Sequence, residues 1–168
     1  MSKDDEFAEY MRARWRPMLS AAVLLGCGQP EAEDLVQVTF TRCYVKWDKV
    51  ARADNRDAYV SRMLLNEFRA SRRRRWWQER PTAEVPDAVV DDMATAHAES
   101  HAMDRALGRL SQPLREAVVL RYFTQLSERE TAEVLGIAPG TVKSRLSRAL
   151  AQLSADSHII DLTNGRQP

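Results

Sequence analysis

Apolar residues recur every three or four positions through most of this chain, and that spacing is the strongest constraint on its fold. Phe7, Met11, Trp15 and Met18 begin the pattern, and the glycines and proline of "GCGQPE" end its first segment. No segment shows sustained alternation of apolar and polar residues flanked by turn residues. The sequence therefore predicts an all-α fold without a sheet.

The helical spacing is interrupted once over a long stretch, residues 81–101, which hold two prolines, five acidic residues and no basic residue. This composition predicts a flexible acidic linker. On each side we expect a small helical domain, residues 5–80 and residues 102–155, with a modest core and weak mutual packing. The last residues, 156–168, show no strong pattern and are expected to form a loose tail.

The formal net charge of +1 hides a segregation of charge along the chain. Residues 1–80 carry about +4, the linker carries −5 and residues 102–168 carry +2. Two basic modules on either side of an acidic connection indicate different partners for the parts. The longest apolar run is far shorter than a membrane span, and the acidic N-terminus lacks a signal-peptide pattern, so we expect a cytoplasmic protein without membrane insertion.

Side chains that carry enzyme chemistry are not grouped in this sequence. Cys27 and Cys43 are isolated and are interpreted as structural thiols. His97 and His101 lie four residues apart, but no third ligand accompanies them. Because no nucleophile–base set, metal-ligand set or glycine-rich phosphate loop is present, we predict neither an enzyme nor a bound metal or cofactor.

The segment Ser127–Leu153 has the features of a helix-turn-helix unit. Ser127 and Glu130 form a capping box, Gly136 permits a sharp turn, and Pro139 opens the next helix. The second helix of such a unit lies in the DNA major groove. Its expected buried side is Val142, Leu146, Ala149, Leu150 and Leu153; its expected DNA-facing residues are Thr141, Lys143, Ser144, Arg145, Ser147 and Arg148. A solvated helix face in a small bundle is the alternative.

Three segments, in this order, resemble an extracytoplasmic-function sigma factor, the promoter-specificity subunit of bacterial RNA polymerase. "AEDLVQVTFTRCYVKW" is similar to the part of sigma domain 2 that docks on the polymerase clamp. "DAYVSRMLLNEFRASRRRR" is similar to the segment that melts and reads the −10 element, and residues 106–153 resemble sigma domain 4. "DNRDAYVSRMLLNEFR" and "WWQERPTAEVPD" look closest to the actinobacterial SigE-like branch.

The resemblance implies where the −10 strand is held. Asn66 occupies a family position that contacts unpaired bases, whereas Ala70 stands where the family often has Asn. Trp76 and Trp77 are expected either to stack on exposed bases or, more commonly for tryptophan, to pack in the core. The full set of −10 candidates is Asp54, Asn55, Arg56, Asn66, Arg69, Arg72, Arg73, Arg74 and Arg75.

The resemblance also implies the partners. Glu33, Asp34, Gln37 and Phe40 are assigned to polymerase binding, although Val38 replaces a common family Asp. Expected partners are promoter DNA and core RNA polymerase, through the clamp region of the largest subunit and through the second-largest subunit. The family often has an anti-sigma factor, but no residue here identifies one. A stand-alone helix-turn-helix regulator acting as a homodimer is the second hypothesis.

Overall fold

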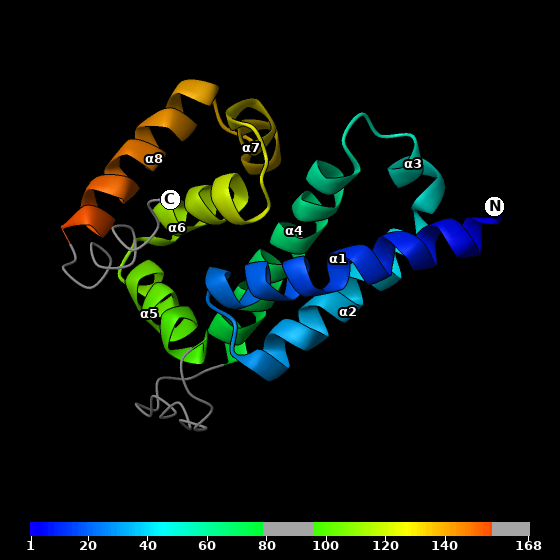
Figure 1. Ribbon diagram of the computed structural model, residues 1–168, viewed down its shortest axis with the longest axis horizontal. Helices are drawn as coiled ribbons and strands as arrows, with labels where there is room; N and C mark the ends of the chain where they lie inside the picture. The colour runs from blue at the N-terminus through cyan, green and yellow to red at the C-terminus, as the bar shows by residue number, and fades with distance from the viewer. Residues whose placement is uncertain (79–95, 156–168) are drawn as a thin grey trace.

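The computed structural model describes residues 1–78 and 96–155, with the backbone alone for residues 96–100. Helix is the only regular secondary structure among these residues, which confirms the all-α prediction (Figure 1). The elements are α1 (Lys3–Leu25), α2 (Gln29–Val45), α3 (Trp47–Ala51), α4 (Arg56–Gln78), α5 (Ala96–Gly108), α6 (Gln112–Val118), the π-helical turn η1 (Val119–Phe123), α7 (Glu128–Leu135) and α8 (Pro139–Ser154).

The boundaries of the predicted linker need one correction. Helix α5 begins at Ala96, so residues 96–101 are helical and not part of an extended connection. The rest of the predicted linker, up to residue 95, and the predicted tail, residues 156–168, lie outside the described residues.

Helices α1 and α2 pack together through an aromatic cluster, and α4 contacts both helices. Helix α1 begins with a capping box in which the Ser2 hydroxyl accepts from the Asp5 amide at 3.2 Å. It ends at Gly26, whose φ of 120° reverses the chain into α2. The rings of Phe7, Tyr10 and Trp15 on α1 lie against Phe40 of α2, with centroids 6.4, 6.5 and 5.9 Å away. Phe40 is buried and the three rings on α1 are half-buried, so the cluster contributes apolar burial to this half of the molecule.

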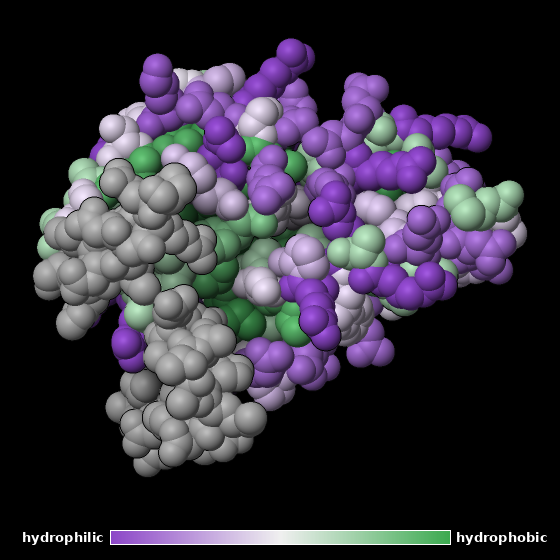
Figure 2. Space-filling view, in the orientation of Figure 1, coloured by the Kyte–Doolittle hydropathy of each residue, from purple (hydrophilic) through white to green (hydrophobic). Residues whose placement is uncertain are grey.

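The N-terminal helices (α1–α4) and the C-terminal helices (α5–α8) share one continuous hydrophobic core. Helix α1 contacts α5, α6 and η1, and α4 contacts α7. In the space-filling view, apolar surface gathers where α1 meets the C-terminal helices, whereas hydrophilic side chains cover most of the remaining face (Figure 2). The expectation of weak mutual packing is therefore wrong: apolar positions such as Leu107 and Val119 are fully buried in the joint core.

Polar contacts strengthen this junction because the last carbonyls of a helix lack partners within the helix. The guanidinium of Arg115 donates to the Leu24 carbonyl, and Gln112 Nε2 donates to the Leu25 carbonyl at 3.3 Å. Arg115 is held in place by Asp104 at 2.9 Å. The C-terminal end of α1 is thus capped by side chains from α6.

Burial determines the chemistry of the two cysteines. Cys27 and Cys43 are buried free thiols, and burial raises their pKa values to about 12 and about 11. Both are neutral at physiological pH, as expected of structural thiols. Among the described residues, no group of His, Cys, Asp and Glu is arranged to hold a metal ion. In the same part of the chain no helix has the length and apolarity that a membrane crossing needs.

Candidate nucleic-acid interface

The helix-turn-helix unit has the geometry that its sequence predicts. The Ser127 hydroxyl accepts from the Glu130 amide at 3.1 Å, and the Glu130 carboxylate accepts from the Ser127 amide at 2.8 Å. Gly136 has a φ of 69°, a left-handed conformation that glycine adopts without strain. Ala138 gives no side-chain cap to α8, and Pro139 opens that helix. The turn and the cap fix α8 relative to α7.

Helix α8 buries one side and presents the other to solvent. Val142, Leu146 and Ala149 are buried, whereas Leu150 is exposed and Leu153 is half-buried. The prediction for Leu150 is wrong because position 150 lies about 100° around the helix from Ala149. On the outer side Thr141, Lys143, Ser147 and Arg148 are exposed, and Ser144 and Arg145 are half-buried. Arg148 Nη2 donates to Ser144 Oγ at 2.9 Å, which pre-positions one cation on this face.

The loop before α4 is held by its own contacts and by α7. Asn55 Oδ1 accepts from the Ala58 amide at 3.1 Å and caps α4. Asn55 Nδ2 donates to Glu130 Oε1 at 2.6 Å. The Arg56 guanidinium donates to the Ala51 carbonyl and lies over the Trp47 ring, 5.6 Å from its centroid. Asp54, the third candidate in this loop, is exposed to solvent.

The arginines of α4 differ in what they contact. Arg72 donates to the Gly26 carbonyl at 2.8 Å, and Arg75 pairs with Glu31 at 3.0 Å. Arg72 therefore ties α4 to the loop between α1 and α2, and Arg75 ties α4 to α2. Arg73 and Arg74 are exposed. Arg69 makes a two-atom contact with Glu116 of α6, with nitrogen–oxygen distances of 3.3 and 2.6 Å.

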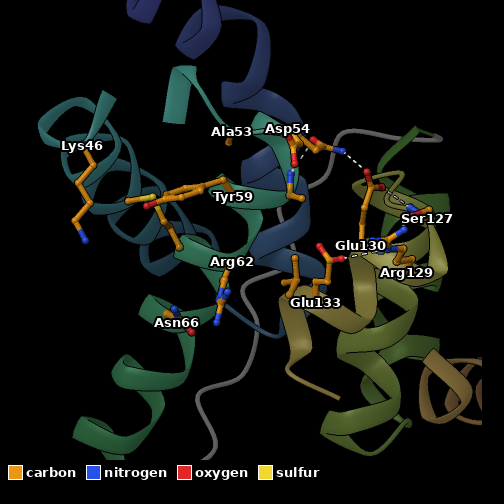
Figure 3. A pocket seen from close by; sticks show the side chains of 14 residues that line it. Lys46, Ala53, Asp54, Tyr59, Arg62, Asn66, Ser127, Arg129, Glu130 and Glu133 are labelled. Atoms are coloured by element: carbon orange, nitrogen blue, oxygen red, sulfur yellow. Dashed lines mark hydrogen bonds and ion pairs between the residues drawn. The ribbon is translucent and has the colours of Figure 1, made fainter. Parts of the chain in front are cut away.

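A cleft of about 700 Å³ lies between the loop before α4, the first half of α4, and α7 (Figure 3). Asp54, Arg62 and Asn66 line one side of this interdomain cleft. Glu130 and Glu133 line the other side, and Figure 3 shows Glu130 pointing toward the loop before α4. Hydrogen bonds from the Ser127 amide, and then from Asn55, lower the pKa of Glu130, so its charge persists at the cleft.

The predicted polymerase-binding residues lie on α2, with one exception. Glu33, Asp34 and Gln37 are exposed. Phe40 is 2% exposed and packs inside the aromatic cluster, so its assignment to a partner surface is wrong. Position 40 follows Val36 by one helical turn, and Val36 is also buried.

Some contacts in this region had no sequence signal. Glu116 is buried on α6 and Glu130 on α7 is half-buried, yet each binds a −10 candidate on the other half of the molecule. Carboxylates occur throughout the chain, and their spacing does not identify which distant cation or amide they meet. The one local clue was that Glu130 belongs to a capping box, which fixed its position on α7.

A helix-turn-helix unit with an outward basic face, combined with a second arginine-rich helix, is typical of nucleic-acid-binding proteins. Family models give the class: "Sigma-70 region 2" matches residues 10–78, and "Sigma-70, region 4" matches residues 100–153. The chain belongs to the extracytoplasmic-function sigma factors of the sigma-70 family.

Three bacterial sigma factors are similar to this chain over most of its length. The RNA polymerase sigma-E factor of Streptomyces avermitilis is 40% identical over 162 residues, which cover 94% of this chain and 88% of the relative. The sigma-E factor of Streptomyces coelicolor is 36% identical over 162 residues, covering 94% and 89%. The ECF sigma factor EcfG of Rhodopseudomonas palustris is 34% identical over 142 residues, covering 83% and 78%.

Two solved structures share the fold. The sigma factor RpoE of Bartonella quintana, in complex with the anti-sigma factor NepR, has a TM-score of 0.73 and 27% identity, covering 89% of this chain and 95% of that one. CnrH in complex with the cytosolic domain of CnrY has a TM-score of 0.67 and 26% identity, covering 95% and 90%.

Proposed function

We propose that this chain binds core RNA polymerase and directs it to specific promoters, with α8 reading −35 duplex DNA and α4 holding the melted −10 element. The observation that carries the proposal is the outer face of α8, which offers cations and hydroxyls and is not covered by other described helices. Such a face fits the major groove, where Arg and Lys recognise guanine and hydroxyl groups recognise several bases. The polymerase performs the chemistry.

The proposed −10 contacts begin at Asn66, whose exposed amide lines the interdomain cleft. An amide offers both a donor and an acceptor, which suits the edge of an unpaired base. Asp54 lines the same cleft and is a second candidate. Arg73 and Arg74 are available for phosphates along the outer part of α4, which makes this binding salt-dependent.

The described arrangement is a closed one with respect to the −10 strand. Asn55 and Arg69, both −10 candidates, are bound by carboxylates of α7 and α6. DNA phosphate and these carboxylates compete for the same hydrogen-bond donors. In our proposal, α4 and its preceding loop separate from α6 and α7 when polymerase and promoter DNA bind, so that the strand replaces Glu116 and Glu130.

Polymerase binding is assigned to the exposed face of α2. Glu33, Asp34 and Gln37 give this face an acidic character, and Val38 adds an exposed apolar side chain. An acidic and partly apolar face fits a basic partner such as the clamp region of the largest subunit, through steering and local ion pairs. Contact of the C-terminal helices with the second-largest subunit, and binding of an anti-sigma factor, are part of the same proposal.

Co-purification with core polymerase tests the proposal against a stand-alone regulator, which would bind DNA without polymerase.

Arg145→Ala and Asn66→Ala then separate the two DNA contacts. Arg145→Ala is expected to weaken −35 duplex binding by about 1–3 kcal/mol if it makes a bidentate base contact. Asn66→Ala should leave closed-complex binding unchanged and reduce permanganate reactivity of −10 thymines. If Asn66→Ala opens promoters as well as wild type does, Asn66 is not part of the −10 site.

A further inference from the structure

Asn66, the proposed −10 contact, stands next to a buried carboxylate on α4. Glu67 is only 6% exposed, and the guanidinium of Arg42 on α2 donates through Nη1 to its Oε1 atom. The Arg42 side chain is itself exposed, so this ion pair joins a buried charge to a cation at the surface. The proposed DNA and polymerase contacts do not use this pair.

The buried part of α4 ends close to Asn66. Phe68 is its last buried residue, and residues 69–78 are half-buried or exposed. Trp76 and Trp77 are 76% and 81% exposed, so of the two expectations for them, packing in the core is wrong. The orientation of α4 at Asn66 is therefore set by the residues up to Phe68 and by the side-chain contacts around them.

The Glu67 carboxylate makes the polar contact that lies nearest to Asn66 within the N-terminal half. Other polar side-chain contacts between α4 and this half lie at least five residues from Asn66, at Asp57, Ser71, Arg72 and Arg75. Arg69 is closer, but its partner lies on α6, which moves away in the proposed opening. Once the cleft is open, the ion pair at Glu67 is the polar tie that holds this turn of α4 against α2.

Loss of the Arg42 cation would turn Asn66 away from its base. A buried carboxylate without a partner is strongly unfavourable, and rotation of α4 toward water relieves that cost. Positions 66 and 67 are about 100° apart on one helix, so a rotation that exposes Glu67 turns Asn66 by the same angle. The Asn66 side chain is short, and its amide beside the interdomain cleft moves with the backbone of α4 (Figure 3).

We propose that Arg42 is a positioning residue for −10 recognition: it keeps Glu67 buried and so holds α4 in the rotation at which Asn66 meets its base. The inference rests on the proposed function, because it requires that Asn66 reads a base. Arg42 supplies a cation at one point, through a single nitrogen. Lys can supply the same charge as a point donor, whereas Ala cannot.

The test measures base preference with the complete holoenzyme, formed from core RNA polymerase and the full chain. A pool of short single strands with a randomised central segment is bound, and sequencing of the bound strands gives the preference at each position. Asn66→Ala identifies the position that Asn66 reads, where a good side-chain–base pair discriminates by about five-fold or more. Arg42→Ala should reduce the preference at that position to below about two-fold and leave the other positions unchanged.

Two further variants separate positioning from stability. Arg42→Lys should keep the preference, because it keeps the cation. Arg42→Ala/Glu67→Gln should regain more than half of it, because a neutral amide has less need to reach water than a carboxylate has. Urea unfolding shows separately that each variant is folded. Weaker binding of DNA with an unchanged preference at every position would mean that Arg42 only stabilises the fold, and would overturn the proposal.

Arg14→Ala is the matched control. The exposed Arg14 pairs with Asp57, so this variant also breaks an ion pair of α4. Asp57 lies nine residues before Asn66, which corresponds to about 14 Å along the helix axis. The preference at the position that Asn66 reads should stay at its wild-type value. An equal loss in Arg14→Ala would show that any weakening of the contacts of α4 has this effect, which contradicts a specific role of Arg42.

The same variants distinguish failure of this inference from failure of the proposed function. If Asn66→Ala removes the preference at one position and Arg42→Ala removes none, Arg42 does not position α4, and the assignment of Asn66 stands. If Asn66→Ala changes no position, the proposed function is wrong at Asn66, and the inference is wrong with it. If Arg42→Ala weakens only the binding of core polymerase, Arg42 is a polymerase contact and not a positioning residue.

Discussion

The ion pair between Arg69 and Glu116 gives the sharpest prediction about this fold. The Glu116 side chain is 5% exposed and that of Arg69 is 40% exposed. Arg69→Ala leaves a buried carboxylate without its partner, a change that costs about 3–5 kcal/mol where both groups are fully buried. Because water reaches the Arg69 side, we expect the lower cost of a charged hydrogen bond, a loss of about 1.5–3 kcal/mol in the free energy of unfolding.

Urea unfolding followed by circular dichroism at pH 7 measures this loss. Glu116→Gln in the Arg69→Ala background is the matched control, because it removes the buried charge and keeps the side-chain shape. We expect the double variant to regain more than half of the stability that Arg69→Ala removes, as a double-mutant cycle would show. A loss below about 0.5 kcal/mol in Arg69→Ala, the range typical of surface changes, would refute the reasoning.

The double variant also separates two roles of Arg69. It restores stability but cannot restore a DNA contact. If Arg69 binds the −10 strand after the cleft opens, the double variant should remain defective in open-complex formation, as measured by permanganate reactivity. If a stable double variant opens promoters as well as wild type does, the only role of Arg69 is the contact between α4 and α6.

Two smaller predictions concern helix ends. Gly26→Ala should destabilise the fold by about 1–3 kcal/mol, since φ is 120° and a Cβ would lie 2.6 Å from Arg72 Nη2; Gly28→Ala, where a Cβ meets nothing within 4 Å, is the control in thermal unfolding. Glu130→Ala should lower the free energy of unfolding by about 1 kcal/mol at pH 7, because it removes one half of the capping box. The folded-state pKa of Glu130 is below its ordinary 4.5, so this contribution is complete above pH 4.5 and disappears as the pH falls through the folded value. The difference between Glu130→Ala and wild type in urea unfolding should therefore shrink in acid. The control is the exposed Glu128→Ala, which should differ less from wild type at pH 7. A difference for Glu130→Ala that does not change with pH would contradict the capping role of the charge.

Local features of the sequence predicted the local structure well. The capping box at Ser127, the turn at Gly136 and the start of α8 at Pro139 depend on backbone preferences of neighbouring residues. The outer face of α8 followed from helical periodicity, because a residue's side of a helix is set by its spacing from buried positions. Periodicity erred at Leu150, which is exposed. The assignment of Phe40 to polymerase binding came from the family resemblance, and the burial of Phe40 contradicts it.

By itself, the sequence determined the helices, their caps, the helix-turn-helix unit and the family resemblance, because these depend on short-range spacing and residue type. Only the tertiary structure decided which of several identical side chains have a partner within the molecule. Arg72 and Arg75 bind within the molecule, whereas Arg73 and Arg74 face solvent. Likewise, Arg69 meets a carboxylate 47 residues away. Such choices follow from how the two halves pack around one core, and a one-dimensional pattern carries no distance between residues far apart in the chain.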